Sequence, residues 1–344
     1  MTTTVADAER ASRALLPRVS RTFALGIKLL PPHLEPPVRL GYLLCRIADT
    51  VEDDLALPAP RRAELLDAFL HCFDSEEAAN AFGACAAELT SSPDYLELVR
   101  TSGEVFLMYR KLNDASREIL REWVEEMVHG MRRFVLEHPT GIRIANVEEF
   151  KEYCYYVAGT VGHLLTDLWH AHSVFVGPRH YARLLENCEP FGEALQTVNI
   201  LKDVAWDVEQ ENQIYIPADL LAAAGSTHES ILAADNRAAT RKAMAPLLAL
   251  ANDDVERALI YIEQLPLNAV RIRLFCVLPI LLAIATLREL EQTDAMLVPG
   301  GGVKITRGEV KALMIAASAS SLTNPSLRWI ARRTRQRPFS LALR

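Results

Sequence analysis

The chain has 344 residues, of which half are hydrophobic and 24% are charged, so it can build a sizeable core. Its formal net charge of −7 argues against general nucleic-acid binding, because that function needs a basic face. The 6 cysteines include no CxxC pair, which favours reduced thiols in a cytoplasmic protein over a disulfide framework.

Neither a secretory signal nor a membrane anchor is expected. The N-terminal sequence lacks the basic-then-apolar order of a signal peptide. The longest apolar run, 274–287, contains Pro279 and is shorter than the ~20 residues that a membrane span needs. We therefore expect this run to form a buried core helix.

The apolar pattern predicts an all-α protein. Ala, Leu, Glu and Arg are abundant, and alternation of β-branched residues is scarce. Turn-rich breaks fall at 30–32, 57–60, 138–141 and 298–302, and none is long enough to be a flexible linker. The expected helices are 5–16, 20–29, 35–54, 60–72, 76–89, 93–110, 114–136, 147–171, 177–208, 217–222, 227–264, 270–290 and 306–319.

The expected helix 35–54 carries an acidic cluster near its end. Asp49, Glu52 and Asp53 are three or four residues apart and would share one helix face. Arg46 lies one turn earlier in otherwise apolar sequence, and its guanidinium is suited to phosphate oxygens. Unpaired carboxylates are costly in apolar surroundings, so a bound cation is a reasonable partner for them.

A second cluster lies in the expected helix 177–208, where Asn199, Asp203 and Asp207 are spaced by one helical turn. Two such clusters facing each other would suit Mg²⁺, which takes a few carboxylates and completes its shell with water and phosphate oxygens. The sequence therefore predicts a diphosphate-ionising site. For either cluster alone, the alternative interpretation is an ordinary solvent-facing helix.

The segment 326–344 contains several arginines and no acidic residue. It is predicted to be a loosely ordered basic tail, outside a domain at 1–325, that could contact anionic lipid headgroups. The alternative interpretation is a solubilising tail.

Several motifs occur in the order typical of one enzyme family. They are the segments 20–24, 42–54, 153–162, 196–207 and 214–217. Two later segments, 275–287 and 303–308, are of a kind that marks squalene synthases rather than phytoene synthases. The chain thus resembles the squalene and phytoene synthase family over nearly its whole length, and its squalene synthase branch most closely.

This resemblance implies a single-domain class I isoprenoid synthase-type helical bundle around a central apolar cavity. It also implies Mg²⁺-dependent head-to-head condensation of two farnesyl diphosphates through presqualene diphosphate, followed by reduction to squalene with NADPH. The protein would be cytoplasmic, and at most peripheral to a membrane. No GxGxxG motif follows a strand pattern, so a Rossmann-type cofactor site is not expected.

The resemblance assigns roles to residues of this chain in four groups. The metal ligands would be Asp49, Glu52, Asp53, Asn199, Asp203 and Asp207. The substrate would contact Ser20, Arg21, Phe23, Arg46, Gln196, Asn199 and Phe275. Catalysis would involve Tyr156 with Asp49, Asp53, Asp203 and Asp207. The NADPH phosphates would meet Arg21, Arg46, Lys202 and Lys304.

Some of the expectations that follow from the resemblance have plain alternatives. Phe23 and Phe275 could be ordinary core residues, as could Tyr156 if the family is left aside. The glycine run 300–302, just before Lys304, would form a mobile loop that could close over the cofactor. The alternative for this run is a simple flexible turn. We interpret His163 as structural.

Four positions depart from the family pattern. Lys202 stands where an arginine is usual, and Trp206 where a glutamate is usual. Gln213 and Thr306 replace basic residues. These changes leave other activities open: a different prenyl donor, a phytoene-, dehydrosqualene- or hydroxysqualene-type product made without reductant, or an inactive protein that binds prenyl diphosphates.

Overall fold

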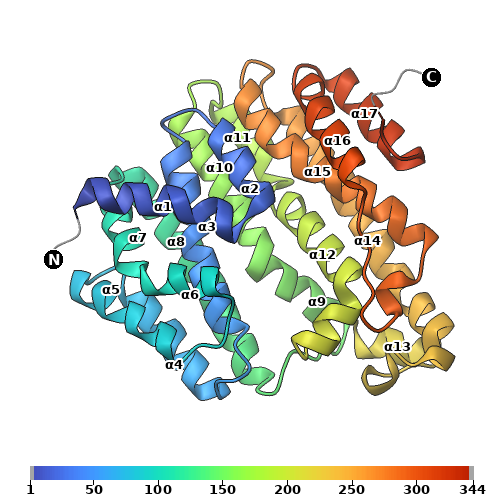
Figure 1. Ribbon diagram of the computed structural model, residues 1–344. Coiled ribbons are helices and arrows are strands. Elements are labelled where there is room, and N and C mark those ends of the chain that lie inside the picture. The colour runs from blue at the N-terminus through green and yellow to red at the C-terminus, as the bar shows by residue number, and fades with distance from the viewer. Residues whose placement is uncertain (1–3, 341–344) are drawn as a thin grey trace. The chain divides into compact units, whose positions relative to one another are not determined.

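The described part of the protein is built from helices (Figure 1). The computed structural model describes residues 4–340, without the side chains of Arg21 and Thr22. Within these residues the extended structure amounts to one isolated β-bridge, between Arg143 and Ile214. The all-α prediction is confirmed.

Between residues 4 and 340, seventeen α-helices and several short turns of other helical types follow one another. The α-helices are α1 (Val5–Val19), α2 (Arg21–Leu29), α3 (Glu35–Glu52), α4 (Ala59–His71), α5 (Glu76–Phe82), α6 (Pro93–Arg100), α7 (Ser102–Tyr109), α8 (Asp114–Glu137), α9 (Val147–Cys154), α10 (Thr160–His172), α11 (Pro178–Leu185), α12 (Cys188–Gln210), α13 (Ala218–Ala224), α14 (Arg237–Gln264), α15 (Val270–Gln292), α16 (Arg307–Ser320) and α17 (Asn324–Gln336).

Some expected helices are divided in the structure. The expected helix 93–110 consists of α6 and α7, because Thr101 leaves the helical conformation with φ −95° and ψ 17°. The expected helix 177–208 consists of α11 and α12, which a two-residue break separates. The apolar period continues across both breaks, so the pattern alone did not reveal them.

Internal contacts divide the chain into two compact units. Unit 1 comprises 1–140 and 167–173, and unit 2 comprises 141–166 and 174–344. The chain therefore enters unit 2, returns briefly to unit 1 through the second part of α10, and then completes unit 2.

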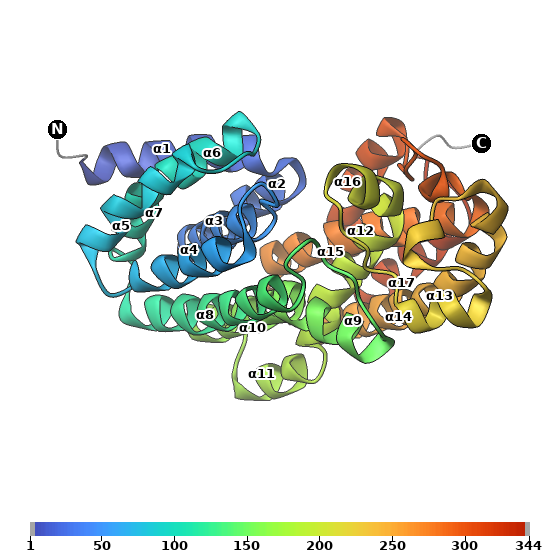
Figure 2. The ribbon, with the colours of Figure 1, turned by 90° about the horizontal axis from the view of Figure 1, so that it is seen from below.

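In unit 1, α3 is the central helix. It packs against α1, α2, α4, α6, α7 and α8, and α4 lies alongside α8 (Figure 2). The side chains of Leu40, Leu43, Leu44 and Ile47 are fully buried. Because other helices pack against α3 on several sides, the backbone that carries the acidic cluster near its C-terminal end is held in place.

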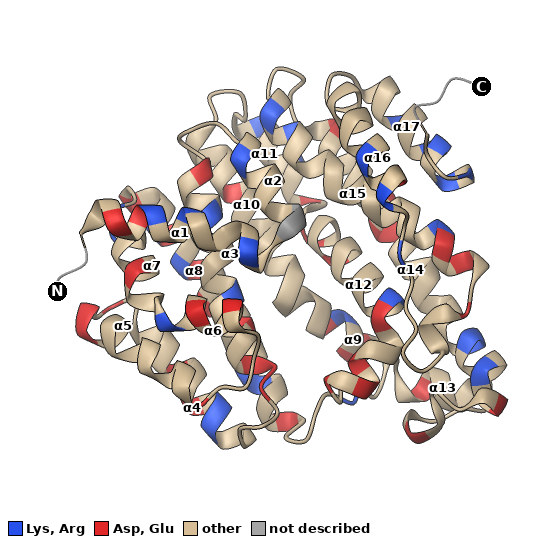
Figure 3. Ribbon diagram, in the orientation of Figure 1, with Lys and Arg blue, Asp and Glu red and all other residues tan. Residues whose placement is uncertain are grey.

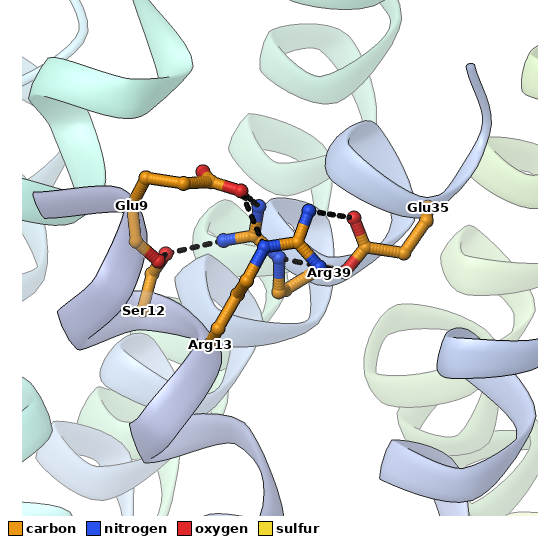
Figure 4. Close-up of polar contacts among 5 residues, drawn as sticks. All are labelled: Glu9, Ser12, Arg13, Glu35 and Arg39. Atoms are coloured by element: carbon orange, nitrogen blue, oxygen red, sulfur yellow. Dashed lines mark hydrogen bonds and ion pairs between the residues drawn. The ribbon is translucent and has the colours of Figure 1, made fainter. Parts of the chain in front are cut away.

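A charged network fastens α1 to the first turns of α3 (Figure 4). The guanidinium of Arg39 is fully buried and donates to Glu35 at 3.0 Å and to both oxygens of Glu9 at 2.9 Å. It also donates to the hydroxyl of Ser12. Arg13 donates to Glu35 at 2.9 Å and to Glu9 at 2.6 Å, so each carboxylate is shared by two arginines.

In unit 2, α12 packs against α14 and α15, and α15 is covered by α16 and α17. The helix α15 is long and apolar enough to cross a membrane, with a mean hydropathy of 2.1 over its best window, but 78% of that window is buried inside the structure. The described structure therefore uses α15 as a core helix, as the sequence predicted for the run 274–287.

The prediction of a loosely ordered tail is wrong for residues 326–336, which belong to α17. Thr323 precedes the helix as its N-cap, and its side chain accepts the backbone N–H of Ser326. Its buried face consists of Leu327, Ile330, Ala331 and Thr334. Arg328 donates to Glu256 at 2.8 Å and to Glu263 at 2.6 Å, so α17 is attached to α14 by both packing and charge. The domain limit expected at 325 remains a prediction.

Candidate functional site

The acidic cluster of α3 lies in the last turn of that helix, where the negative end of the helix dipole favours a cation. Asp49 and Arg46 form an ion pair in which both side chains are about one-third exposed, at 31% and 29%. The carboxylate of Asp49 raises the pKa of Arg46 above its usual value. In this structure the first expected metal ligand is therefore held by its own basic neighbour.

Arg46 also lies between two aromatic rings. Its guanidinium carbon is 5.8 Å from the ring centre of Tyr42 and 5.3 Å from that of Tyr95. The ring of Phe23 is 5.8 Å from that of Tyr42, and Ser20 caps α2 by accepting the backbone N–H of Phe23. The structure thus gathers Ser20, Phe23 and Arg46 in one neighbourhood of unit 1.

Two of these neighbours, Tyr42 and Tyr95, were not among the residues assigned a role from the sequence. Tyr42 could have been found, because it lies one helical turn before Arg46. Tyr95 lies in α6, far along the chain, and no local pattern connects it to Arg46.

Glu52 is almost fully buried, with 3% of the residue exposed. Its Oε1 atom is buried without a hydrogen-bond partner among the described residues. Burial and the charge of Asp49 together raise the pKa of Glu52 to about 8. A buried carboxyl with an unpartnered oxygen is suited to a cation, because a cation would compensate the burial of its charge.

The other two acids of this cluster differ from Glu52. Asp53 is exposed at the C-terminal cap of α3. Asp54 is buried and accepts the backbone N–H groups of Ala56 and Thr90, so it fixes the following loop. The side-chain oxygens of Asp49, Glu52 and Asp53 do not converge within 4.8 Å of one another in the described structure. A shared cation would therefore require side-chain movement.

The acidic cluster of α12 lies in the second half of that helix. Asn199 is exposed, and Asp203 is 33% exposed and paired with Lys202. This arrangement parallels the pairing of Asp49 with Arg46 in unit 1. Trp206 is 56% exposed, and its indole N–H donates to Glu211 at 3.3 Å.

Asp207 is the buried member of the α12 cluster, with 8% exposed. Burial, followed by the charges of Glu211 and Asp203, raises its pKa to about 8. A cavity of about 10 Å³, roughly the size of one water, is lined by Asp207, Gln213 and Tyr215 together with aliphatic residues.

Gln213, one of the departures from the family pattern, is buried and supports the neighbouring backbone. It is 2% exposed, and its side-chain oxygen accepts the backbone N–H of Ile142. Ile214 continues this contact by donating its backbone N–H to Ile142 at 2.9 Å. Because Gln213 is committed to this pairing, its side chain is not directed to a phosphate in the described structure.

The glycine segment 300–302 is joined to α12 at two points. The backbone N–H of Gly300 donates to Glu209 at 2.7 Å, and that of Val303 donates to the carbonyl of Lys202 at 3.2 Å. Lys304, which follows, is exposed. Lys202 and Lys304 therefore belong to two segments in contact, whereas Arg46 belongs to unit 1.

Tyr156 lies in a π-helical turn, η2 (Tyr155–Gly159), that joins α9 to α10. Such turns occur often at functional sites, because they insert one extra residue into a helix. Tyr156 is partly exposed, and its ring lies 5.2 Å from that of Tyr155. Tyr153 instead packs on Tyr215, with ring centres 5.0 Å apart.

The π-helical turn is held against α12 by close backbone contact. A Cβ atom on Gly192 of α12 would lie 2.0 Å from the carbonyl oxygen of Ala158. A Cβ on Gly162 of α10 would lie 1.8 Å from the carbonyl oxygen of Cys188. Both glycines therefore allow an approach that no other residue permits without a backbone shift.

Gly192→Ala should lower the free energy of unfolding by about 2 kcal/mol, because the new methyl group overlaps a backbone atom. Urea unfolding followed by circular dichroism measures this loss. Gly308→Ala is the matched control, because its Cβ would have only the Thr306 hydroxyl nearby, at 3.9 Å. Equal stability of the two variants would contradict the close contact.

Behind the π-helical turn, α12 and α14 contribute two acids with raised pKa values. Burial and the charge of Asp254 raise the pKa of Glu193 to about 7. Burial and the charge of Asp253 raise that of Asp254 to about 7. The charges of Lys151 and Arg257 lower the pKa of both acids, but they do not outweigh burial and the neighbouring carboxylates.

These raised values predict a stability that falls with pH. The folded protein holds protons on Glu193 and Asp254 that the unfolded chain has already lost, so their contribution is complete below about pH 4 and is lost as pH rises through about 7. At about pH 8, the free energy of unfolding of Asp254→Asn should therefore exceed that of the parent by on the order of 2 kcal/mol. The advantage should shrink or vanish at about pH 5; a pH-independent difference would contradict the assignment.

Three expected site residues remain to be located. Gln196 lies on α12, partly exposed, one turn before Asn199. Phe275 is buried in α15, with 5% exposed. The side chain of Arg21 lies outside the described residues. His163 contacts Glu189 at 2.8 Å and the Cys188 thiol at 3.4 Å.

The donors of both clusters fit Mg²⁺ in chemical type, because carboxylate and amide oxygens are the ligands that hard cations take in proteins. In unit 1, the buried Glu52 oxygen that lacks a hydrogen-bond partner in the described structure is a further reason to expect a cation at this cluster. In each cluster one acid is engaged by a neighbouring base through one carboxylate oxygen, so a bound cation would compete with Arg46 or Lys202 for that carboxylate.

Comparison with known proteins identifies relatives over most of the chain. The family described as squalene/phytoene synthase matches residues 16–309. The squalene synthase of Schizosaccharomyces pombe is 28% identical over 85% of this chain, and the probable squalene synthase of Neurospora crassa is 28% identical over 91%. The chain spans 63% and 62% of the length of these two relatives.

Solved structures share the fold. A structure of TcSQS in complex with the ligand BPH1237 is similar with a TM-score of 0.83 and 24% identity, covering 98% of this chain and 94% of that one. The squalene synthase HpnC from Alicyclobacillus acidocaldarius is similar with a TM-score of 0.56 and 19% identity, covering 85% and 97%. At these identities the likeness concerns the fold alone.

Proposed function

Because the chain belongs to the squalene/phytoene synthase family, we propose that it joins two prenyl diphosphates head to head. The proposed substrate is farnesyl diphosphate, the intermediate is presqualene diphosphate, and the product after reduction is squalene. One observation carries the proposal beyond the family match. Each acidic cluster lies in the C-terminal half of a helix that is central to its own unit, α3 in unit 1 and α12 in unit 2.

The proposed metal ligands are oxygens from both clusters: Asp49, Glu52, Asp53, Asn199, Asp203 and Asp207. Bound Mg²⁺ would supply Lewis-acid neutralisation of the departing diphosphate. The buried acids Glu52 and Asp207 have raised pKa values that favour their neutral forms in the absence of a cation. A cation would restore the charged form of both acids.

The proposed diphosphate contacts are made by two basic side chains that form ion pairs with acids of the clusters in this structure. Arg46 is paired with Asp49, and Lys202 with Asp203. If the carboxylate of Asp49 or Asp203 bound a cation, the base paired with it would be free to contact the diphosphate oxygens. Arg46 can form a bidentate contact with phosphate, whereas Lys202 offers only a point charge.

Tyr156 is the proposed proton-transfer residue for the cyclopropylcarbinyl stage. Its partial exposure and its place in the π-helical turn support this role. Tyr156→Phe should lower kcat about a hundredfold with little change in KM, because only the proton donor is removed. Tyr155→Phe is the matched control in the same turn. Equal loss in both variants would assign the effect to packing.

NADPH is the proposed reductant. Lys202 and Lys304 would meet its phosphates from two contacting segments, and the glycine segment 300–302, which precedes Lys304, contacts the helix α12. Arg21 and Arg46 complete the set implied by the resemblance.

The deciding experiment is product analysis by mass spectrometry after incubation with farnesyl diphosphate, Mg²⁺ and NADPH. Squalene is expected, with no product when Mg²⁺ is chelated. Geranylgeranyl diphosphate serves as the competing donor, and preference for it would move the protein to the phytoene-type activity.

A second candidate function is a synthase that stops before reduction. Trp206 and Gln213 replace polar and basic residues near the proposed cofactor segments, and Gln213 is committed to Ile142. Presqualene diphosphate, hydroxysqualene or dehydrosqualene formed equally with and without NADPH would support it. Mg²⁺-dependent binding of farnesyl diphosphate without turnover would instead indicate an inactive homologue.

A further inference from the structure

The helical hairpin formed by α16 and α17 exposes three large apolar side chains. Ile315 of α16 is 60% exposed, Leu322 in the connecting turn is 55% exposed, and Trp329 of α17 is 62% exposed. Each is more than half exposed, although a large apolar side chain normally gains by burial. A group of such residues indicates a surface that meets another apolar phase.

Ile315 and Trp329 lie outside the buried faces of α16 and α17. Both helices pack against α15, so their opposite faces point to solvent. The hydroxyl of Ser326 donates to the carbonyl of Ala319 at 2.8 Å, which joins the start of α17 to the end of α16. Leu322 lies in the turn between the two helices, with Ile315 before it in α16 and Trp329 after it in α17.

A fourth apolar residue lies beside this turn. The buried guanidinium of Arg273 donates to the carbonyl of Ser321 at 2.8 Å and to that of Leu265 at 2.7 Å. It thereby joins the turn before α17 to the turn between α14 and α15. Leu267 in that second turn is 50% exposed.

The same outward faces are basic, although the whole chain is acidic. Arg307, Lys311 and Arg332 are exposed, and within residues 4–340 none of them forms an ion pair with a carboxylate. Figure 3 shows basic residues along the ribbon of α16 and α17. The acid of α16, Glu309, is buried and bound to Arg288, and α17 contains no acid. The face is thus positive and apolar together.

We propose that this face docks on an anionic lipid surface. The hairpin face is defined by Leu267, Ile315, Leu322 and Trp329 together with Arg307, Lys311 and Arg332. Tryptophan favours the interface between headgroups and acyl chains, and each nearby arginine or lysine adds attraction to anionic lipid. The ordered hairpin thus takes the place of the loose basic tail as the membrane-contacting element. The inference does not depend on the proposed chemistry.

The test is co-sedimentation of the full chain with vesicles of phosphatidylcholine, with and without about 30% phosphatidylglycerol. Binding should require the anionic lipid and weaken as salt rises from about 0.1 M to about 0.5 M. Trp329→Ser should weaken binding on the order of tenfold. Arg332→Gln should weaken it about fivefold, the factor expected for one basic residue at the surface.

Matched controls come from unit 1. Leu136→Ser removes an apolar side chain that is 43% exposed, and Arg10→Gln removes a basic side chain that is 79% exposed. Both should bind like the parent. Ile315→Ser and Lys311→Gln form a second pair of test variants, and thermal unfolding checks that each variant is folded.

Three results would overturn the inference. The first is equal sedimentation with neutral and anionic vesicles, or none with either. The second is unchanged binding by folded Trp329→Ser and Arg332→Gln. The third is a dimer, measured by light scattering, that Trp329→Ser dissociates and that shows no affinity for vesicles; the face would then join two copies of the chain.

Discussion

Asp49→Asn should reduce turnover of farnesyl diphosphate by about a thousandfold while the fold is retained. The amide keeps the shape of the side chain but removes the charge that would bind a cation, and loss of one stabilising contact at developing charge costs about this factor.

The measurement is steady-state turnover over a range of Mg²⁺ concentrations, with circular dichroism as the test of folding. Asp94→Asn is the control, because Asp94 is a half-exposed acid of the same unit paired with Arg18. Asp203→Asn should behave like Asp49→Asn if both clusters hold metal. Near-normal activity in either cluster variant would remove the metal assignment for that cluster.

Arg39→Ala should destabilise unit 1 by about 3 kcal/mol, because it removes the fully buried base between two carboxylates. Glu35, itself nearly buried, would be left with Arg13 alone. Hydrogen exchange should therefore accelerate in α1 and in the first turns of α3, and chemical unfolding should begin at lower denaturant.

Arg13→Ala is the contrasting variant. Its side chain is 51% exposed, so removing it should cost about 1 kcal/mol or less, although it contacts the same two acids. Equal losses for Arg13→Ala and Arg39→Ala would mean that burial does not control the strength of this network. Faster exchange confined to unit 2 would also contradict the prediction.

Periodicity was sufficient to predict the helices but not their interruptions. The break at Thr101 and the break between α11 and α12 lie within continuous apolar patterns, which carry no signal for them. α17 could have been predicted from Leu327, Ile330 and Thr334, which have helical spacing. The arginine-rich composition obscured it, because the partner acids Glu256 and Glu263 lie far along the chain.

For the site, residue types were predictable and partnerships were not. The acids were found from their spacing, but the burial of Glu52 and Asp207 and the exposure of Asp53 depend on tertiary packing. Gln213 looked like a lost phosphate contact, whereas its side chain supports the backbone at Ile142. Contacts over long sequence separations, such as Arg46 with Tyr95, leave no local pattern.

The π-helical turn at Tyr155–Gly159 has a consequence for comparing this chain with its relatives. The extra residue rotates everything after it by about 100° relative to everything before it, which is the angle of one residue in a helix. A helical wheel drawn through 147–172 therefore assigns Tyr156 and His163 to a common side without justification. A relative that lacks one residue here would present different side chains from α10, so a single-residue gap in an alignment at this point marks a change of face.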